Sequence, residues 1–230
     1  PENLPCIWLD DKSVVMHKEG KWQTWDIYSD TYCDYKPTQK FPEAYLKGQS
    51  LWLKNSDGSE TVVAESENSQ ITYGDFVSRN EFGIEDGIFW SPDSTKIAFY
   101  RKDESKVTGF PLLDITTRTG SLKEIKYPMA GMDSENVQLG IYDLAQGTTI
   151  YVKAEEYGYD RYLTNISWSP KSSHVYIQVL DRSQKQMKLN MYDASTGDLT
   201  ATILNEDNEK YVEPQDPLYF IKKADGIFIY

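Results

Sequence analysis

The chain has 230 residues, with 24 Lys and Arg against 36 Asp and Glu, and its formal net charge is −12. This balance argues against nucleic acid as a partner, because binding phosphates requires clustered basic side chains. The 39% of hydrophobic residues suffices for a core, but no apolar run is long enough to cross a bilayer. Aromatic residues make up 13% of the chain and favour strands, so we expect a soluble, all-β protein.

The chain contains two cysteines, Cys6 and Cys33. Two are too few for a disulfide scaffold or for a zinc site, and the sequence leaves open whether they pair or remain thiols. The chain begins at Pro1 and shows no charged segment followed by an apolar one, as an export signal would. The compartment therefore has to be inferred from another feature.

Two segments repeat one pattern. Ile-Phe-Trp-Ser-Pro opens residues 88–100, Ile-Ser-Trp-Ser-Pro opens residues 166–178, and an apolar run follows each at the same distance. Proline fixes φ and cannot donate to a strand ladder, so Ser-Pro is expected to open a turn between two strands. We predict one β-hairpin that is used twice.

A second hairpin is predicted after each of these. Alternating apolar residues flank a glycine-containing turn in residues 139–152 and 189–203, and residues 51–63 are an earlier copy. Two successive hairpins make four antiparallel strands, which is one blade of a β-propeller.

Blades of roughly 40–50 residues predict a partial β-propeller of about four to five blades. We expect one partial domain over residues 1–230. Its units are residues 7–64 (part of a blade at 7–30 and a degenerate blade at 35–64), 81–153 with an insertion between Arg101 and Asn136, 156–204, and the start of another at 211–230. An open ring would expose strand edges, so we expect the chain to be a piece of a larger protein.

Motifs for catalysis are absent from the sequence. It contains no Gly-x-Ser-x-Gly nucleophile elbow, no phosphate-binding loop and no zinc or calcium motif. His17 and His174 lie in or beside predicted strands, and we interpret them as surface or edge residues. The charged run at 205–209 is interpreted as a solvated loop. We expect no catalytic residue, metal ligand or cofactor in this chain, and no peptidase activity of the chain alone.

Four segments, in one order and at fitting distances, resemble a known family. They are Arg-Asn-Glu-Phe-Gly-Ile-Glu-Asp-Gly-Ile-Phe-Trp-Ser-Pro-Asp (79–93), Lys-Tyr-Pro-Met-Ala-Gly (126–131), Tyr-Leu-Thr-Asn-Ile-Ser-Trp-Ser-Pro (162–170) and Tyr-Val-Glu-Pro (211–214). Over about residues 44–230 the chain resembles the N-terminal β-propeller of the dipeptidyl peptidase IV family of serine exopeptidases, and within it bacterial prolyl tripeptidyl peptidases. Residues 1–40 fit only the general blade pattern.

The resemblance implies a role without catalysis. An eight-bladed propeller would gate access and hold the amino end of a peptide, while an α/β-hydrolase domain that follows it, absent here, would carry the Ser, Asp and His triad. The implied partners are that domain and a peptide with a free amino terminus and Pro near the cleaved bond, and a homodimer stays open. The implied setting is a bacterial periplasm, cell envelope or extracellular space. The alternative is a stand-alone propeller that acts as a protein-interaction scaffold.

The resemblance also singles out residues of the polar segment 79–87, which its composition alone would make a surface loop. The family's amine-anchoring motif, often Glu-Glu, falls on Asn80 and Glu81. A carboxylate can form a charge-assisted hydrogen bond with the protonated amine of a peptide. Arg79 and Phe82 would shape the pocket, or serve the fold. One carboxylate in place of two fits the tripeptidyl branch better, although di- and tripeptide release both stay open.

We expect the Glu81 carboxylate to point into a cavity without a protein cation as its partner. Glu85 lies four residues further on and would share a face with Glu81 only if the segment is a helical turn.

Overall fold

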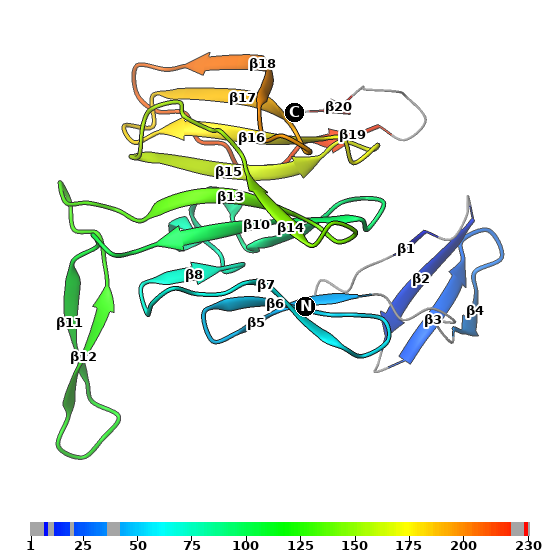
Figure 1. Cartoon of the computed structure of the whole chain (residues 1–230), viewed down its shortest axis with the longest axis horizontal. Helices are drawn as coiled ribbons and strands as arrows, with labels where there is room; N and C mark the ends of the chain where they lie inside the picture. Colours follow the sequence, from blue (N-terminus) through cyan, green and yellow to red (C-terminus); the bar gives the residue numbers. More distant parts are fainter. Residues whose placement is uncertain (1–6, 9–11, 19–20, 36–41, 222–227, 230) are drawn as a thin grey trace. The chain divides into compact units, whose positions relative to one another are not determined.

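A computed structural model describes residues 7–8, 12–18, 21–35, 42–221 and 228–229. Within these residues the regular elements are strands, apart from one short 3₁₀ helix, η1 (Ser78–Gly83). The expected all-β class is therefore confirmed. The chain separates into two compact units, residues 1–43 with 54–59 and residues 44–53 with 60–230, and each is described by itself (Figure 1).

The first unit contains one four-stranded antiparallel sheet in chain order. Its strands are β1 (Ile7–Trp8), β2 (Ser13–Lys18), β3 (Lys21–Asp26) and β4 (Thr31–Asp34). Val14 and Val15 of β2 are buried, and Trp25 of β3 stacks on Tyr32 of β4 with 6.0 Å between ring centroids. Cys33 is an exposed free thiol, while Cys6 and the side chain of His17 lie outside the described part of the chain.

The second unit holds the other sheets. A three-stranded sheet runs β5-β6-β7, the next sheet runs β14-β13-β10-β8 with β9 also paired to β10, and a four-stranded sheet runs β15-β16-β17-β18. Two further pairs are β11-β12 and β19-β20. The bounds are β5 (Glu43–Lys47), β6 (Ser50–Lys54), β7 (Glu60–Ala64), β8 (Ile71–Tyr73), β9 (Ile88–Trp90), β10 (Lys96–Asp103), β11 (Gly109–Asp114), β12 (Ser121–Lys126), β13 (Asn136–Asp143), β14 (Thr148–Tyr151), β15 (Arg161–Trp168), β16 (His174–Asp181), β17 (Gln186–Asp193), β18 (Leu199–Asp207), β19 (Tyr219–Phe220) and β20 (Phe228–Ile229).

The two Trp-Ser-Pro hairpins form as predicted. Strand β9 pairs with β10, and β15 pairs with β16. In the first turn the hydroxyl of Ser91 accepts from the Lys96 amide at 2.9 Å, and in the second the hydroxyl of Ser169 accepts from the His174 amide at 3.0 Å. The serine therefore closes the turn that the following proline opens, because its side chain satisfies a backbone donor that the turn leaves unpaired.

The second hairpin of each repeat also forms. Strand β13 pairs with β14, β17 pairs with β18, and the earlier copy is the pair β6-β7. An aspartate shapes each of the two later turns, since its carboxylate accepts backbone amides of the turn, from Gln146 to Asp143 at 2.9 Å and from Thr196 to Asp193 at 3.0 Å. This is the local bonding that makes aspartate favourable in turns.

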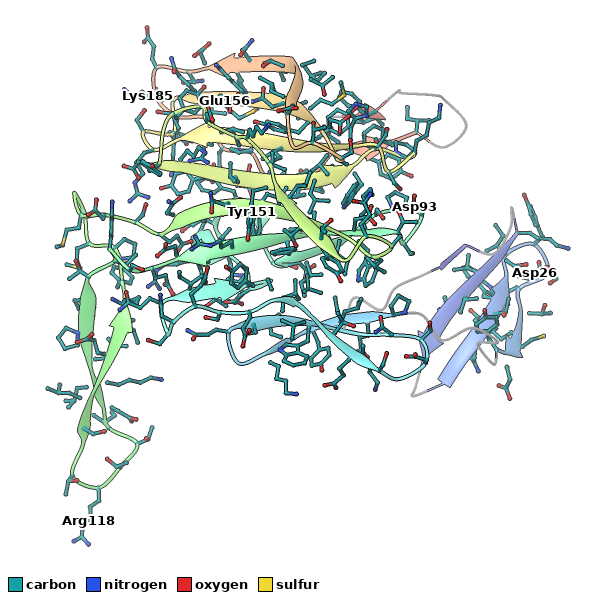
Figure 2. All side chains as sticks on the ribbon, viewed as in Figure 1. Asp26, Asp93, Arg118, Tyr151, Glu156 and Lys185 are labelled. Carbon is teal, nitrogen blue, oxygen red and sulfur yellow. The ribbon has the colours of Figure 1, made fainter. Side chains whose placement is uncertain are left out.

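The predicted insertion is a separate hairpin. Strands β11 and β12 pair only with each other among the described strands, and they form an arm that extends away from the sheets of the second unit (Figure 1). Arg118 lies at the free end of this arm (Figure 2).

The sheets of the second unit stack face to face with a core between each pair. One cluster, which includes Leu51 and Phe99, joins the β5-β7 sheet to the next sheet. A second, which includes Leu139 and Ile177, joins that sheet to the β15-β18 sheet. A third, which includes Leu189, joins the last sheet to the segment that follows it. Burial on both faces explains the apolar runs Ile97–Tyr100 in β10 and Val175–Ile177 in β16.

One expectation was wrong, and one stated condition is not met. The charged run 205–209 is not wholly a loop, because β18 continues to Asp207 as an exposed strand. Glu81 and Glu85 do not share a helical face, because η1 ends at Gly83 and the backbone is extended at Ile84. The 3₁₀ segment is too short to bring side chains four positions apart onto one face.

Candidate functional site

The segment that carries the candidate site is η1, between β8 and β9. Three apolar side chains fix it to the core: Val77, Phe82 and Ile84 are all at most 5% exposed. The backbone between them is irregular, with positive φ at Arg79, Asn80 and Phe82. The buried apolar residues therefore hold a strained turn that leaves the polar side chains on its outer side.

Glycine is required at the end of this segment. Gly83 has a φ of +71°, and a Cβ placed on it would lie 2.5 Å from the backbone oxygen of Gln215. A larger residue would push the turn away from the segment after β18. The position of Glu81 thus depends on close backbone packing two residues later.

Glu81 lines a cavity of about 150 Å³, to which Arg79, Glu135 and Arg161 also contribute. Its side chain is exposed, and no ion pair within 4.0 Å reaches it from any residue that the structure describes. The carboxylate is therefore available to a cation from outside the chain.

The other three predicted site residues have contacts within the fold. Arg79 donates to the carbonyl of Lys126 and lies over the ring of Tyr127 at 4.3 Å, although it also lines the cavity. The amide of Asn80 donates to the carbonyl of Ile84 at 3.0 Å and so closes the turn. Phe82 is 5% exposed and packs on Tyr162 with 4.9 Å between ring centroids.

Sequence reasoning missed two residues of this cavity, Arg161 and Arg182. Arg161 begins β15, Arg182 follows the end of β16, and the antiparallel pairing of Arg161 with Asp181 brings both to one end of the sheet. Arg182 donates to the Tyr162 hydroxyl at 2.6 Å. The one sequence feature that could have pointed to them is the rarity of arginine. Only five of the 24 basic residues are arginines, and three of the five line this cavity.

Arg161 differs from the other two arginines. Its Nη1 donates to the carbonyl of Gly158, but its Nε is buried and has no hydrogen-bond partner in the described part of the chain. Burial lowers the pKa of this guanidinium below its ordinary value, against the opposing effect of nearby groups such as Glu156. An arginine remains protonated through such a shift, so the cavity contains a charged group with an unused donor.

The two carboxylates of the cavity also differ. Glu135 accepts a hydrogen bond from the backbone amide of Ser78 and so holds the start of η1. Glu81 has no such partner among the described residues. The site therefore combines one uncommitted carboxylate with one incompletely satisfied guanidinium, which suits a ligand that has both a positive and a negative group.

The described part of the chain shows no metal-binding cluster and no membrane-spanning helix. No group of three or more His, Cys, Asp and Glu side chains is arranged there to hold a metal ion. His174 is half-buried at the start of β16, where its Nδ1 shares a hydrogen bond of 2.9 Å with the neighbouring Ser173 hydroxyl. Within the same residues, no helix has the length and apolar character that spanning a membrane requires.

Comparisons with a family model, with curated proteins and with solved structures all give dipeptidyl peptidases or dipeptidyl aminopeptidases as relatives. The family model of the dipeptidyl peptidase IV N-terminal region matches residues 15–230. A protein of Phaeosphaeria nodorum assigned as dipeptidyl-aminopeptidase B is 28% identical over 195 residues, or 77% of this chain and 21% of that protein. The dipeptidyl-aminopeptidase B of Aspergillus niger is 26% identical over 199 residues, or 77% of this chain and 22% of that protein.

Solved structures match over nearly the whole chain. A protein of Bacteroides ovatus assigned as a dipeptidyl aminopeptidase IV is 37% identical with a TM-score of 0.73, and the match covers 94% of this chain and 31% of that one. The Porphyromonas gingivalis dipeptidyl peptidase 4 shares the fold at 21% identity with a TM-score of 0.71, covering 96% and 33%. The chain thus spans about a fifth of the curated relatives and about a third of the solved chains.

Proposed function

Because the chain belongs to the family of dipeptidyl peptidase IV N-terminal regions, we propose that it is the non-catalytic part of a longer serine exopeptidase. In this proposal it forms part of a β-propeller that gates access to a following α/β-hydrolase domain. It binds the free amino terminus of a peptide that has Pro near the cleaved bond, and the hydrolase domain cuts the peptide.

The observation that carries the anchoring role is the uncommitted Glu81 carboxylate at the cavity. A peptide amine is largely protonated near neutral pH, and a carboxylate without an internal partner can bind it without breaking an existing ion pair. The partly enclosed position strengthens such a bond relative to one in open water.

The propeller is supported by the stacked sheets of the second unit. Two of them contain four successive antiparallel strands, β9-β10-β13-β14 and β15-β16-β17-β18, and a shared core lies between them. Strands that follow one another within a sheet, and sheets that follow one another in a stack, are the arrangement of propeller blades.

The position of the anchor would set the length of the product. An extended peptide advances about 3.3 Å per residue, so the distance from Glu81 to the nucleophile of the hydrolase domain counts the residues released. The relatives named above are dipeptidyl enzymes, whereas the single carboxylate at 80–81 favours tripeptide release in our reading. Product analysis of the full-length protein decides between the two.

The test is Glu81→Gln in the full-length protein. The substitution keeps the shape of the side chain but removes its charge, and losing one partner of a charged hydrogen bond costs about 2–5 kcal/mol. We expect kcat/KM for peptides with a free amino terminus to fall about 30- to several-thousand-fold. Turnover of the same peptides with an acetylated amino terminus should not change.

Glu85→Gln is the matched control. Glu85 is an exposed carboxylate of the same polar segment, but it lines a different cavity, together with Asp86 and Asn165. It should leave kcat/KM unchanged. If Glu81→Gln behaves like this control, Glu81 is not the amine anchor.

We also propose a homodimer and a bacterial setting in the periplasm, the cell envelope or the extracellular space. The arm β11-β12 supports the dimer because Leu113 and Leu122 lie opposite each other on it and are 67% and 77% exposed.

The bacterial origin of the two solved relatives supports the setting. An export signal in the full-length gene would test it.

A further inference from the structure

The Glu81 cavity contains more positive charge than an amine anchor needs. Three arginines and two glutamates line it, in a chain whose net charge is −12. When a substrate ammonium neutralises Glu81, Glu135 is the one carboxylate left against three guanidinium groups. A site with that balance favours an anionic group on the bound molecule.

The three arginines are not equally available to such a group. Arg79 donates to a backbone carbonyl and lies over Tyr127, and Arg182 donates to Tyr162 and lies 3.6 Å from a carboxylate oxygen of Asp160. Arg161 lines the cavity, and among the residues that the structure describes its one hydrogen bond goes to Gly158 and its buried Nε has no partner. An unsatisfied buried donor costs free energy that an acceptor from a ligand would recover.

The acidic groups near Arg161 do not occupy this donor. Glu156 partly offsets the lowering of the Arg161 pKa by burial, but its two carboxylate oxygens accept hydrogen bonds from Asn190 at 2.8 Å and from Tyr192 at 3.1 Å. Glu156 therefore reduces the net charge around Arg161 without satisfying its Nε. The lower net charge weakens the attraction of an anionic ligand to Arg161. The Nε of Arg161 still lacks a hydrogen-bond acceptor that such a ligand could supply.

The size of the cavity limits what can enter it. A volume of about 150 Å³ equals that of an engineered cavity that holds one benzene ring, so one side chain fits and several residues do not. The group that meets Arg161 can therefore belong to the same residue whose amine meets Glu81.

We infer that this cavity selects peptides whose amino-terminal residue is Asp or Glu, with the α-ammonium group on Glu81 and the side-chain carboxylate on Arg161. The inference rests on the proposed function, because Glu81 must first hold the amine. Arginine suits the second contact, since its planar donors match the geometry of a carboxylate.

The test compares two peptides that differ only in the charge of the first side chain. Glu-Ala-Ala amide and Gln-Ala-Ala amide have nearly the same shape, and their Kd values for the full-length protein can be measured by calorimetry. A charged hydrogen bond should make the Glu peptide about 10- to 100-fold tighter. Equal Kd values for the two peptides would overturn the inference.

Variants separate the two contacts. Arg161→Gln should raise the Kd of the Glu peptide to that of the Gln peptide and leave the Gln peptide unchanged. Arg161→Lys keeps the charge without the planar donors and should retain part of the preference, which guards against a folding defect of the first variant. Arg118→Gln, at the end of the arm, is the matched control and should change neither value (Figure 2). A preference that persists in a folded Arg161→Gln protein contradicts the inference.

Glu81→Gln distinguishes this inference from the proposed function. It should weaken both peptides by the same factor, because both have the amine. If both weaken but the wild-type protein shows no preference for Glu, the anchor stands and the acidic specificity is wrong. If neither weakens while Arg161→Gln removes the preference, the acidic specificity stands and the anchor is wrong.

Discussion

At the scale of single residues, the same side-chain types serve either the fold or the site, and their partners decide which. Asn80 and Phe82 lie beside Glu81 in the sequence, but their amide and ring are used to close and bury the turn. Glu135 holds the start of η1, whereas Glu81 has no ion-pair partner in the described part of the chain. Proximity to Glu81 in the sequence is therefore a weak guide to a shared role.

The sequence could indicate Glu81, but not the two arginines, Arg161 and Arg182, that line the same cavity. Glu81 belongs to a continuous motif, so a resemblance over fifteen residues is enough to select it. Arg161 begins β15 and Arg182 follows β16, and only the pairing of these two strands brings the two arginines to one end of the sheet. Without a known topology, nothing in the neighbourhood of either arginine would have placed it at the cavity.

Asp93 gives a prediction at this scale, because it stabilises the first Trp-Ser-Pro turn (Figure 2). Burial alone would raise its pKa, but hydrogen bonds, including those from Ser91 at 2.7 Å and the Thr95 hydroxyl at 2.9 Å, outweigh it and hold the pKa at about 2. A carboxyl with a lowered pKa stabilises the fold above its unfolded pKa of 3.8, and this contribution is lost as the pH falls from 3.8 toward 2.

We therefore expect Asp93→Asn to lower the free energy of unfolding at pH 7 by roughly 0.5–1.5 kcal/mol, a modest value because the group is solvent-exposed. The deficit should shrink at pH 2, where the wild-type carboxyl is itself partly protonated. Urea unfolding at the two pH values measures both quantities. A deficit that is equal at pH 7 and pH 2 would show that the charge of Asp93 does not stabilise the turn.

At the scale of elements, hairpins with a turn signature could be predicted, and exposed edge strands could not. The Trp-Ser-Pro turns and the turns that contain Asp143 and Asp193 have local chemistry that fixes their geometry. The charged end of β18 has no such signature, because its backbone pairs with β17 whatever its exposed side chains are. Charges on an edge strand discourage pairing with other chains, so the feature that suggested a loop is one that protects an edge.

Pairing between β10 and β13 depends on a small residue. Gly140 lies opposite Phe99, a fully buried ring, and a Cβ on Gly140 would lie 2.7 Å from that ring. Gly140→Ala should lower the free energy of unfolding by about 1–3 kcal/mol, because a well-packed core resists added volume. Phe99→Leu in the same chain should reduce the penalty of Gly140→Ala, which a double-mutant cycle by urea unfolding would measure.

Gly109→Ala is the comparison for this prediction. Its Cβ would meet the side chain of Glu124, a flexible and exposed group that can move aside. The free energy of unfolding should change by less than in Gly140→Ala. Equal effects of the two substitutions would mean that the Phe99 ring does not resist the added methyl group.

At the scale of the whole molecule, the chain corresponds to one region of its longer relatives. It spans about a third of the solved relatives, and its sequence contains no Gly-x-Ser-x-Gly elbow. The described residues that line its cavity include arginines and glutamates but no histidine that could act as a base beside a serine. In the proposed function, binding and cutting are thus divided between domains, and the rigid stack of sheets converts the position of one carboxylate into the length of the product.

The arm β11-β12 leads to a prediction about the proposed homodimer. A two-stranded hairpin that projects alone is marginally stable in water, and this one exposes Leu113, Ile115 and Leu122 by 67%, 78% and 77%. Pro111 lacks an amide hydrogen, so the edge of β11 is poorly suited to extending a sheet, and an apolar contact between two arms fits better. Leu113→Glu with Leu122→Glu should therefore convert a dimer of the full-length protein to a monomer in sedimentation. Lys123→Gln on the same strand should leave the dimer intact, and a protein that sediments as a monomer before any substitution would refute the dimer altogether.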